Sequence, residues 1–371
     1  MARNERMKVF LVVGARPNFM KIAPIYEEMK KYPDEFNPLI IHTEQHYDNE
    51  MSRVFFEDLE LPEPDIYLGV GPGSHAVQTA KVMIEFEKVL FRDHPDLVVV
   101  VGDVNSTLAC SLVASKLLIP VAHVEAGLRS FDRTMPEEIN RLVTDSLSDY
   151  LFTTCEDANE NLKREGISEE KVFFVGNTMV DTLLKFKDRY GPTSILSRTR
   201  AKKKGYALLT LHRPSNVDDE RNFTAIINAL EEIQAKIKII FPVHPRTKKQ
   251  IKNMNLEDKF ANMQNFILTE PLGYLDFMSL LTHSKFVLTD SGGIQEETTV
   301  LGIPCLTLRE NTERPITVKE GTNVIVGVDK ERIVEESLKI LNGNGKIGKT
   351  PKFWDGKAAQ RIVKILGRVR T

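Results

Sequence analysis

Acidic residues follow two apolar runs in the first half of the sequence. Residues 98–101 are all valine and lead into Gly102-Asp103, and residues 121–124 lead into Glu125. A helical pattern separates the two runs, so they predict parallel strands joined by one crossover helix. Ligands bind beyond the carboxyl ends of parallel strands, where the strand order reverses, and we therefore expect both carboxylates to face one crevice. Carboxylates in such a place can act as general acids and bases.

A third acid, Glu137, follows a short polar loop. Thr134 and Glu137 also fit a Thr-x-x-Glu capping box with a proline in the first helical turn. The pattern predicts a helix over residues 134–150 and leaves two roles open for Glu137, a helix cap or a group that does chemistry.

Two strand-to-helix turns have the composition of an anion site. The first follows a strand at residues 9–13 and contains Gly14, Arg16 and Pro17. Free backbone N–H groups at such a junction, together with a cation, suit an anionic ligand. A tight turn with a solvated Arg16 is the alternative.

The second turn is Asp290-Ser291-Gly292-Gly293, between a strand at 286–289 and a helix that contains Glu297. Glycines let a phosphate approach the N–H groups and the positive end of the helix dipole. Glu297 could then accept hydrogen bonds from a ribose diol. A purely structural turn is the alternative here.

Strand and helix patterns alternate along most of the chain, as in a doubly wound sheet. Residues 185–205 lose the apolar period and become basic and polar, which marks the best domain boundary. We therefore expect an α/β protein of two Rossmann-like doubly wound domains that face a cleft. The first would span residues 1–190 and carry the acids, the second 191–354 and bind the nucleotide, and residues 355–371 would form a last helix capped by Asp355. A sugar nucleotide is the natural ligand of such a pair.

Composition excludes several classes of protein. A formal net charge of -2 over 371 residues gives no general attraction to nucleic acid or to an anionic membrane surface. Cys110, Cys155 and Cys305 lie far apart, without zinc-binding spacing, and are expected to be reduced core residues of a cytoplasmic protein. No secretory segment or membrane-spanning run is seen, and no complete GxGxxG follows the first strand, so we expect no metal, no bound NAD and no other cofactor.

Seven segments carry a family resemblance. They are GARPNFMKIAP at 14–24, GD at 102–103, HVEAGLR at 123–129, PEEINR at 136–141, LHR at 211–213, DSGGIQEE at 290–297 and TERPITVKEGTN at 312–323. Together they resemble the non-hydrolysing UDP-N-acetylglucosamine 2-epimerases. The resemblance implies a glycosyltransferase-B type fold whose final helix crosses back to the first domain, and a homodimer. It also implies reversible conversion of UDP-N-acetylglucosamine to UDP-N-acetylmannosamine, a precursor of surface polysaccharides.

The resemblance also implies roles for individual residues. The implied contacts to the diphosphate and phosphates are Arg16, Lys21, Ser291, Gly292, Gly293 and Arg314. Glu297 would hold the ribose, and Phe277 would lie by the uracil. The implied acid–base set is Asp103, Glu125, Glu137 and His212.

The chain also departs from the family pattern. Many bacterial members carry an arginine after the Gln-His of the second loop, where this sequence has Gln45-His46-Tyr47-Asp48. Those loops hold a second, activating substrate in regulated members, so we expect weak or absent activation. A glycosyltransferase and a hydrolysing relative that releases N-acetylmannosamine and UDP are the alternative functions.

Overall fold

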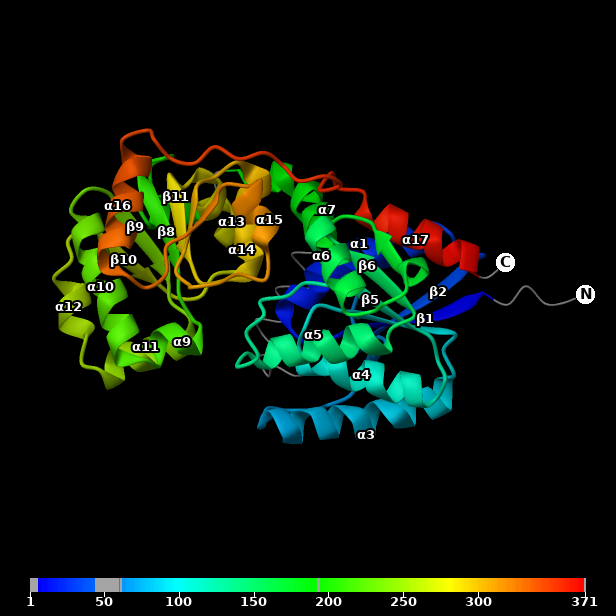
Figure 1. The fold of residues 1–371 in the computed structure, drawn as a ribbon. Coiled ribbons are helices and arrows are strands. Elements are labelled where there is room, and N and C mark those ends of the chain that lie inside the picture. Colours follow the sequence, from blue (N-terminus) through cyan, green and yellow to red (C-terminus); the bar gives the residue numbers. More distant parts are fainter. Residues whose placement is uncertain (1–5, 44–59, 61, 192–193, 370–371) are drawn as a thin grey trace, which may run out of the picture. The chain divides into compact units, whose positions relative to one another are not determined.

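The computed structural model describes residues 6–43, 60, 62–191 and 194–369. The chain forms two compact units, each with its own sheet (Figure 1). Residues 1–185 and 352–371 make up the first unit, and residues 186–351 make up the second.

Within the described residues, the first unit builds a seven-stranded sheet in the order β3-β2-β1-β4-β5-β6-β7, and every neighbouring pair is parallel. Its strands are β1 (Met7–Val13), β2 (Phe36–His42), β3 (Ile66–Tyr67), β4 (Leu97–Val101), β5 (Val121–Ala126), β6 (Tyr150–Thr153) and β7 (Val172–Phe174). Its helices are α1 (Arg16–Lys30), α3 (His75–Asp93), α4 (Asn105–Lys116), α5 (Pro136–Leu147), α6 (Glu156–Arg164), α7 (Thr178–Lys185) and α17 (Ala358–Val369). A 3₁₀ turn, η1 (Glu169–Lys171), precedes β7.

The described part of the second unit builds a six-stranded parallel sheet in the order β10-β9-β8-β11-β12-β13. Its strands are β8 (Tyr206–Thr210), β9 (Lys238–Pro242), β10 (Phe266–Thr269), β11 (Phe286–Thr289), β12 (Cys305–Thr307) and β13 (Asn323–Ile325). Its helices are α8 (Ser194–Arg198), α9 (Pro214–Val217), α10 (Glu220–Gln234), α11 (Pro245–Asn253), α12 (Glu257–Ala261), α13 (Tyr274–His283), α14 (Gly292–Leu301), α15 (Pro315–Lys319) and α16 (Lys330–Leu341), with a 3₁₀ turn η2 (Lys187–Arg189).

Strand order reverses once in each sheet. In the first unit the chain moves from β1 outward through β2 and β3, then returns to the other side of β1 with β4. In the second unit β8, β9 and β10 run one way, and β11 starts again beside β8. Ligands of doubly wound sheets bind beyond the strand ends at such reversals. The candidate positions are therefore the ends of β1 and β4 and the ends of β8 and β11.

The sequence predicted the fold class and the long strands, and the α/β class is confirmed. β4 is buried along its whole length, as a strand with helices on both faces must be. Pattern reading missed β3, β12 and β13, which are two or three residues long and show too little periodicity. The helix predicted over residues 134–150 is shorter, because Tyr150 already begins β6. Among the described residues, no helix has both the length and the apolarity that a bilayer crossing needs.

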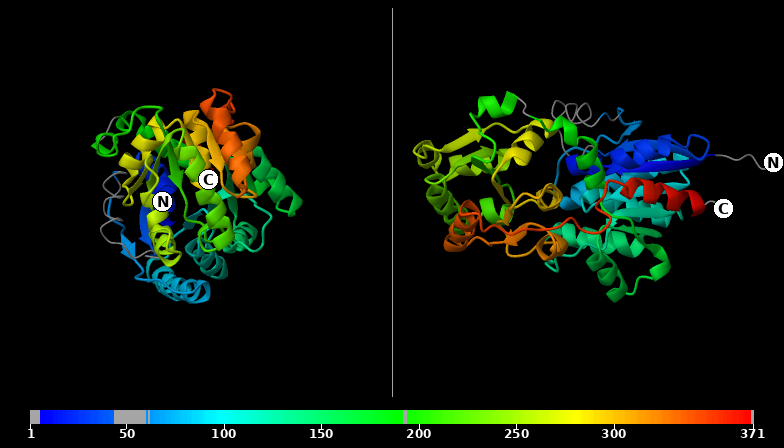
Figure 2. Two further views of the ribbon diagram at one scale, coloured as in Figure 1. Left: turned by 90° about the vertical axis from the view of Figure 1, so that its left-hand side faces the viewer. Right: turned by 90° about the horizontal axis from the view of Figure 1, so that it is seen from above.

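The last helix, α17, packs against α1 and α7 of the first unit (Figure 2). The predicted start at Asp355 and its role as N-cap are wrong, since α17 begins at Ala358. Asp181 of α7 caps it instead and accepts the backbone N–H groups of Ala358 at 3.1 Å and Ala359 at 2.7 Å. Burial raises the pKa of Asp181 to about 6, against the lowering effect of these two N–H donors. A cap supplied from another helix could not be read from local spacing.

Replacing Asp181 with alanine should loosen α17, because two buried N–H groups lose their acceptor. We expect the free energy of unfolding of the first unit to fall by about 1–3 kcal/mol. Urea denaturation and amide exchange of α17 would measure the change. Glu156→Ala is the matched control, since it removes only the exposed contact with Lys352 of the returning segment. Equal stability of the two variants would contradict the role of Asp181.

Candidate active site

Asp103 lies just beyond β4, at the reversal of the first sheet. Its carboxylate accepts a hydrogen bond from Arg141 Nη1 at 2.5 Å, and its backbone carbonyl accepts one from Asn140 at 2.9 Å. Both partners come from α5, so one helix holds the β4 turn from two sides. The Asp103 side chain stays about a quarter exposed, at 28%, while Arg141 is buried. The carboxylate is therefore fixed in direction and open to a ligand.

Glu125 lies in an irregular position near the end of β5. It is buried and has φ of +74°, in the left-handed region that non-glycine residues rarely adopt. The register with β6 shifts between Val124 and Ala126, which marks a β-bulge. Bulges re-aim side chains near functional sites, and strain of this kind persists only where the surrounding structure imposes it.

Lys21 of α1 forms a buried ion pair with Glu125. Its ammonium lies beside the β4 turn, 3.0 Å from where a Cβ of Gly102 would be placed. Asn18, one turn earlier, donates to the carbonyl of Val101 at 3.2 Å. The ends of β1, β4 and β5 are thus joined around one buried cation, and the structure brings together three segments that the sequence singled out separately.

His123 of β5 contacts the turn after β4. Its ring is fully buried, with Nε2 2.8 Å from the carbonyl of Gly102 and Nδ1 2.6 Å from Asp145. The same carboxylate accepts the N–H of Gly127 at 3.0 Å and pairs with Arg129 at 2.7 Å. Burial alone would raise the pKa of Asp145, but His123 and Arg129 hold it below the usual range. The network links the turns that follow β4 and β5.

The predicted capping box at Thr134 and Glu137 is wrong. The N-cap of α5 is Met135, with no side-chain cap, and Thr134 donates to Asp132 instead. Glu138 satisfies the preceding loop and accepts the N–H groups of Ser130 and Phe131 at 3.0 and 2.9 Å. Glu137 is left half-buried on the first turn of α5, the helix that also holds Asp103. The acid that satisfies the loop before α5 is therefore Glu138, and not Glu137 as a capping box would require.

Two predicted positions of the first unit lie partly or wholly outside the described residues. Arg16 begins α1 at the end of β1, but its side-chain contacts are outside what the structure describes. Gln45-His46-Tyr47-Asp48 lies outside the described residues altogether.

In the second unit, His212 follows β8 at the sheet reversal. Its Nδ1 lies 3.0 Å from Oδ1 of Asp290, the residue that directly follows β11. Oδ2 of Asp290 accepts the backbone N–H groups of His212 and Arg213 at 2.8 and 2.7 Å. A single buried carboxylate thus fixes both the ring and the backbone of the β8 turn.

The glycine turn also lies at this reversal, where Gly292 begins α14. A Cβ at Gly292 would come within 2.4 Å of Glu313 and 2.5 Å of Arg314, so side chains of the chain itself already occupy that space. Arg314 is buried between Glu313 at 2.6 Å and Glu296 at 2.9 Å. Despite burial, Arg314, Arg309 and Arg213 hold the pKa of Glu313 far below its usual range. The predicted arginine is therefore part of a buried ion network beside the turn.

Glu297 is buried in α14, one turn after the glycines. Burial and the neighbouring charge of Glu296 raise its pKa to about 8, so the isolated protein holds it protonated at neutral pH. A protonated carboxyl can both donate and accept, which suits a diol. Phe277 lies half-buried on α13.

Sequence reasoning missed several residues of both sites. They are Asn18, His123, Arg141, Asp145, Arg213, Asp290, Glu296, Arg309 and Glu313. Asp290 had a usable signal, since it follows a buried strand as Asp103 does. Arg309 and Glu313 are four residues apart and pair locally. Contacts such as those of Asn18 with Val101 and of His123 with Asp145 join distant segments, which spacing does not reveal.

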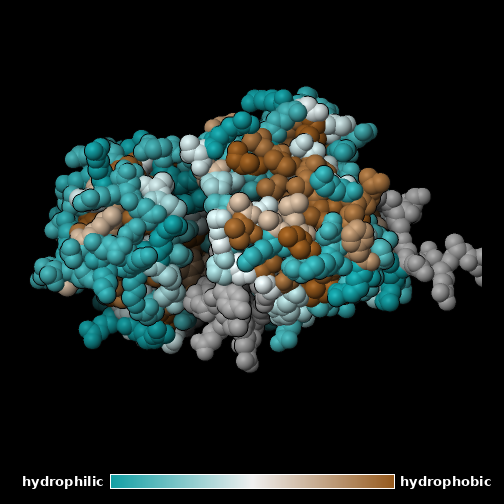
Figure 3. Space-filling model, turned by 90° about the horizontal axis from the view of Figure 1, so that it is seen from below, coloured by the Kyte–Doolittle hydropathy of each residue, from teal (hydrophilic) through white to brown (hydrophobic). Residues whose placement is uncertain are grey.

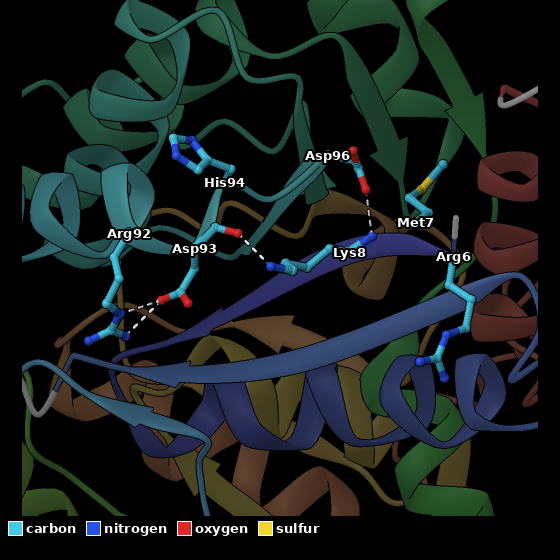
Figure 4. Close-up of a pocket in the computed structure, with 7 residues that line it drawn as sticks. All are labelled: Arg6, Met7, Lys8, Arg92, Asp93, His94 and Asp96. Atoms are coloured by element: carbon cyan, nitrogen blue, oxygen red, sulfur yellow. Dashed lines mark hydrogen bonds and ion pairs between the residues drawn. The ribbon is translucent and has the colours of Figure 1, made fainter. Parts of the chain in front are cut away.

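A pocket lies beside the amino ends of β1 and β4 in the first sheet (Figure 4). It has a volume of about 500 Å³ and is lined by Arg6, Met7, Lys8, Arg92, Asp93, His94 and Asp96. Lys8 donates to the Asp93 carbonyl at 2.6 Å, and Arg92 pairs with the Asp93 carboxylate at 2.7 Å. These charged groups therefore bind one another in the pocket lining. The pocket also lies at the amino ends of the strands, away from the strand ends where the sheet order reverses. Among the described residues, no cluster of three potential metal ligands occurs, and all three cysteines are buried and free.

Comparison with known proteins agrees with this geometry. The family model for UDP-N-acetylglucosamine 2-epimerase matches residues 27–367. The UDP-N-acetylglucosamine 2-epimerase of Methanocaldococcus jannaschii is 47% identical over 365 residues, 97% of this chain and 99% of that protein. The UDP-2,3-diacetamido-2,3-dideoxy-D-glucuronate 2-epimerase of Pseudomonas aeruginosa is 40% identical over 98% of this chain and 100% of its own length.

The fold matches solved structures equally well. The crystal structure of the M. jannaschii UDP-GlcNAc 2-epimerase in complex with UDP-GlcNAc and UDP superposes with a TM-score of 0.91 at 47% identity, covering 98% of this chain and 100% of that one. Strand-end acids, a glycine turn at the second reversal and this full-length similarity lead to one conclusion. The chain belongs to the UDP-N-acetylglucosamine 2-epimerase family.

Proposed function

We propose that the chain catalyses the reversible epimerisation of UDP-N-acetylglucosamine to UDP-N-acetylmannosamine at C2, without hydrolysis. The observation that carries the proposal is that Asp103 follows β4 while a strained, buried Glu125 lies near the end of β5, the neighbouring parallel strand. Proton removal from carbon and its return need more than one acid–base group at a single sugar position. Sequence similarity to the M. jannaschii epimerase over nearly the whole chain supports the same reaction.

The chemistry proceeds by elimination and re-addition. The C2–H bond beside an acetamido group is too weak an acid for simple deprotonation, so proton removal is coupled to departure of UDP. A base takes the C2 proton, the C–H electron pair forms the C1–C2 double bond, and the C1–O bond breaks to release UDP. Re-addition of UDP at C1, with protonation of C2 from the other face, gives the manno epimer. Asp103, Glu125, Glu137 and His212 supply the acid–base groups, and Lys21 keeps an ammonium against Glu125.

The second unit binds the nucleotide in this proposal. Gly292 and Gly293 present backbone N–H groups in the first turn of α14, a ten-residue helix with a positive end, and Ser291, whose own N–H donates to Thr289, adds its hydroxyl. Beside them, the ion network contains three arginines (Arg213, Arg309 and Arg314) and two glutamates (Glu296 and Glu313). Arg314 of this network, with Arg16 and Lys21 of the first unit, is proposed to contact the diphosphate. Glu297 holds the ribose, and Phe277 lies by the uracil.

Product analysis separates this function from the alternatives. A glycosyltransferase needs an acceptor, and a hydrolysing relative releases free N-acetylmannosamine and UDP. NMR of the product from UDP-N-acetylglucosamine alone should show UDP-N-acetylmannosamine. The uronate substrate named for the P. aeruginosa relative belongs in the same assay. We also propose a cytoplasmic location, which the three free, buried cysteines favour.

We propose that the enzyme is a homodimer that associates through α3. Val77, Ile84 and Phe91 of this helix are exposed and recur every seven residues, so they form one apolar stripe. Apolar side chains gather on the face of the first unit that carries α3 (Figure 3). An exposed apolar stripe marks an interaction site, and a helix stripe can pack on its own symmetry copy across a two-fold axis.

The elimination mechanism predicts deuterium at C2 of the product when the reaction runs in D2O. Asp103→Asn and Glu125→Gln should each lower turnover about 10²–10⁴-fold, because proton transfer is lost. UDP affinity, measured by calorimetry, should stay close to that of the unaltered enzyme. Glu169→Gln is the matched control, since this exposed carboxylate pairs only at the surface with Lys163. Product without deuterium at C2, or a requirement for added NAD, would contradict the mechanism.

Glu297 predicts a pH-dependent stability of the second unit. Its pKa is about 8 when folded, against an ordinary 4.5, so the folded state binds the proton more tightly. Stability should therefore fall as pH rises from about 4.5 to 8, by on the order of 5 kcal/mol if the full shift is expressed. Glu297→Gln should remove this slope in urea denaturation, and the exposed Glu257→Gln should retain it. A slope that persists in Glu297→Gln would contradict the assignment.

The α3 stripe predicts that Ile84→Glu disrupts the dimer, because two carboxylates would be buried across the two-fold axis. Light scattering after gel filtration should give twice the chain mass for the unaltered protein and the mass of one chain for the variant. Ile347→Glu is the matched control, since Ile347 is an exposed isoleucine of the second unit. A monomeric unaltered protein, or a dimeric Ile84→Glu, would refute the proposal.

A further inference from the structure

The carboxylate of Asp290 is the most completely buried acid next to a proposed catalytic group. It is fully buried at the end of β11 and lies against the turn after β8, the neighbouring parallel strand. The two strands are in register at Thr289 and Thr210, whose hydroxyl groups lie 2.6 Å apart. Register therefore places the residue after Thr289 against the backbone that begins at Leu211.

The two oxygens of Asp290 have different tasks. Oδ2 accepts the backbone N–H groups of His212 and Arg213 at 2.8 and 2.7 Å, and Nδ2 of Asn216 lies 3.4 Å from it. Oδ1 lies 3.0 Å from Nδ1 of His212. Burial alone would raise the pKa of Asp290, but His212 and these N–H groups hold it below the usual range. The contact between Oδ1 and Nδ1 is an ion pair at 3.0 Å, and Oδ1 accepts no hydrogen bond from the described residues. An ionised carboxylate can only accept, so Nδ1 is the atom that carries a proton toward it.

We propose that Asp290 is the positioning residue of His212, holding the ring in the Nδ1–H tautomer so that Nε2 is the atom that exchanges a proton with the substrate. The inference rests on the acid–base role proposed above for His212. One edge of the ring faces Asp290, the His244 ring lies beside it at 5.4 Å between centroids, and 37% of the side chain is exposed. Which nitrogen of a histidine reacts is set by the hydrogen bond that the other one makes.

The same carboxylate connects the ring to the nucleotide turn. Asp290 directly precedes Ser291, whose N–H donates to the Thr289 hydroxyl at 2.9 Å. Asp290 therefore lies between the two: its side chain contacts His212, the proposed proton-transfer group, and its backbone leads into the proposed phosphate-binding turn. Asp290 sets the position of His212 relative to whatever anion Ser291, Gly292 and Gly293 hold.

The first test is spectroscopic and needs no turnover. With ¹⁵N-labelled histidine, and His212→Gln to assign the signal, the neutral His212 ring should show Nδ1 protonated and Nε2 as the unprotonated nitrogen. An Nε2–H tautomer in the unaltered protein would overturn the proposal.

Asp290→Asn provides the second test. Its amide oxygen can still accept the backbone N–H groups, but its NH2 group then faces Nδ1 and favours the Nε2–H tautomer. We expect that tautomer, a turnover number lowered about 10²–10⁴-fold, and UDP affinity within about threefold. Asp218→Asn is the matched control. It makes the same acid-to-amide change at an exposed carboxylate that lies 3.4 Å from Arg246 and accepts from Gln250 at 2.7 Å, and it should keep both the tautomer and the turnover.

The outcomes separate this inference from the proposed function. Near-normal turnover of Asp290→Asn beside an inactive His212→Gln would overturn the positioning role alone. Near-normal turnover of His212→Gln would remove His212 from the acid–base set, and the positioning proposal would fall with it. If the chain lacks epimerase activity, the tautomer of His212 still decides whether Asp290 sets the ring.

Discussion

The wholly parallel order of both sheets is the constraint on which both sites depend. Parallel strands all end at one edge, so residues far apart in sequence meet there without long loops. Asp103 and the first residues of α1 share one such edge, and His212 and Asp290 share another. The reversals of strand order then decide which of these ends can reach a ligand. Chemistry in this protein is placed by topology first and by side-chain contacts second.

Buried charge distinguishes the two sites in kind. In the first unit, Lys21 pairs with Glu125, and Arg141 joins Asp103 to Glu138, so each of these carboxylates is fixed in direction. In the second unit, arginines and glutamates share partners around the glycine turn. Removal of one side chain would therefore leave several buried charges without an ion-pair partner. The first arrangement suits groups that exchange protons, and the second suits a rigid surface for a charged ligand.

The sequence predicted what periodicity and strand-end position can encode. The α/β class, the long strands and the acids at the ends of β4 and β5 follow from apolar runs and from what ends them. The cap of α17 by Asp181, the real task of Glu138 and the His123 network do not, because each joins segments that are distant in sequence or departs from local cap rules. The left-handed backbone of Glu125 is also invisible to a pattern, since propensity favours glycine there. The residues that pattern reading misplaced are those whose conformation is imposed by neighbours.

The return of residues 352–371 to the first unit has a consequence for synthesis. The second unit is continuous in sequence, whereas the first lacks α17 until the ribosome has made residues 358–369, after the whole of the second unit. Until then, the face formed by α1 and α7, which α17 covers, is open, and Trp354 has not reached its buried place with its indole N–H on the carbonyl of Thr154. Synthesis of the first unit therefore begins before that of the second unit and finishes after it. Nascent chains stalled before residue 352 will present an apolar surface that the finished protein never shows.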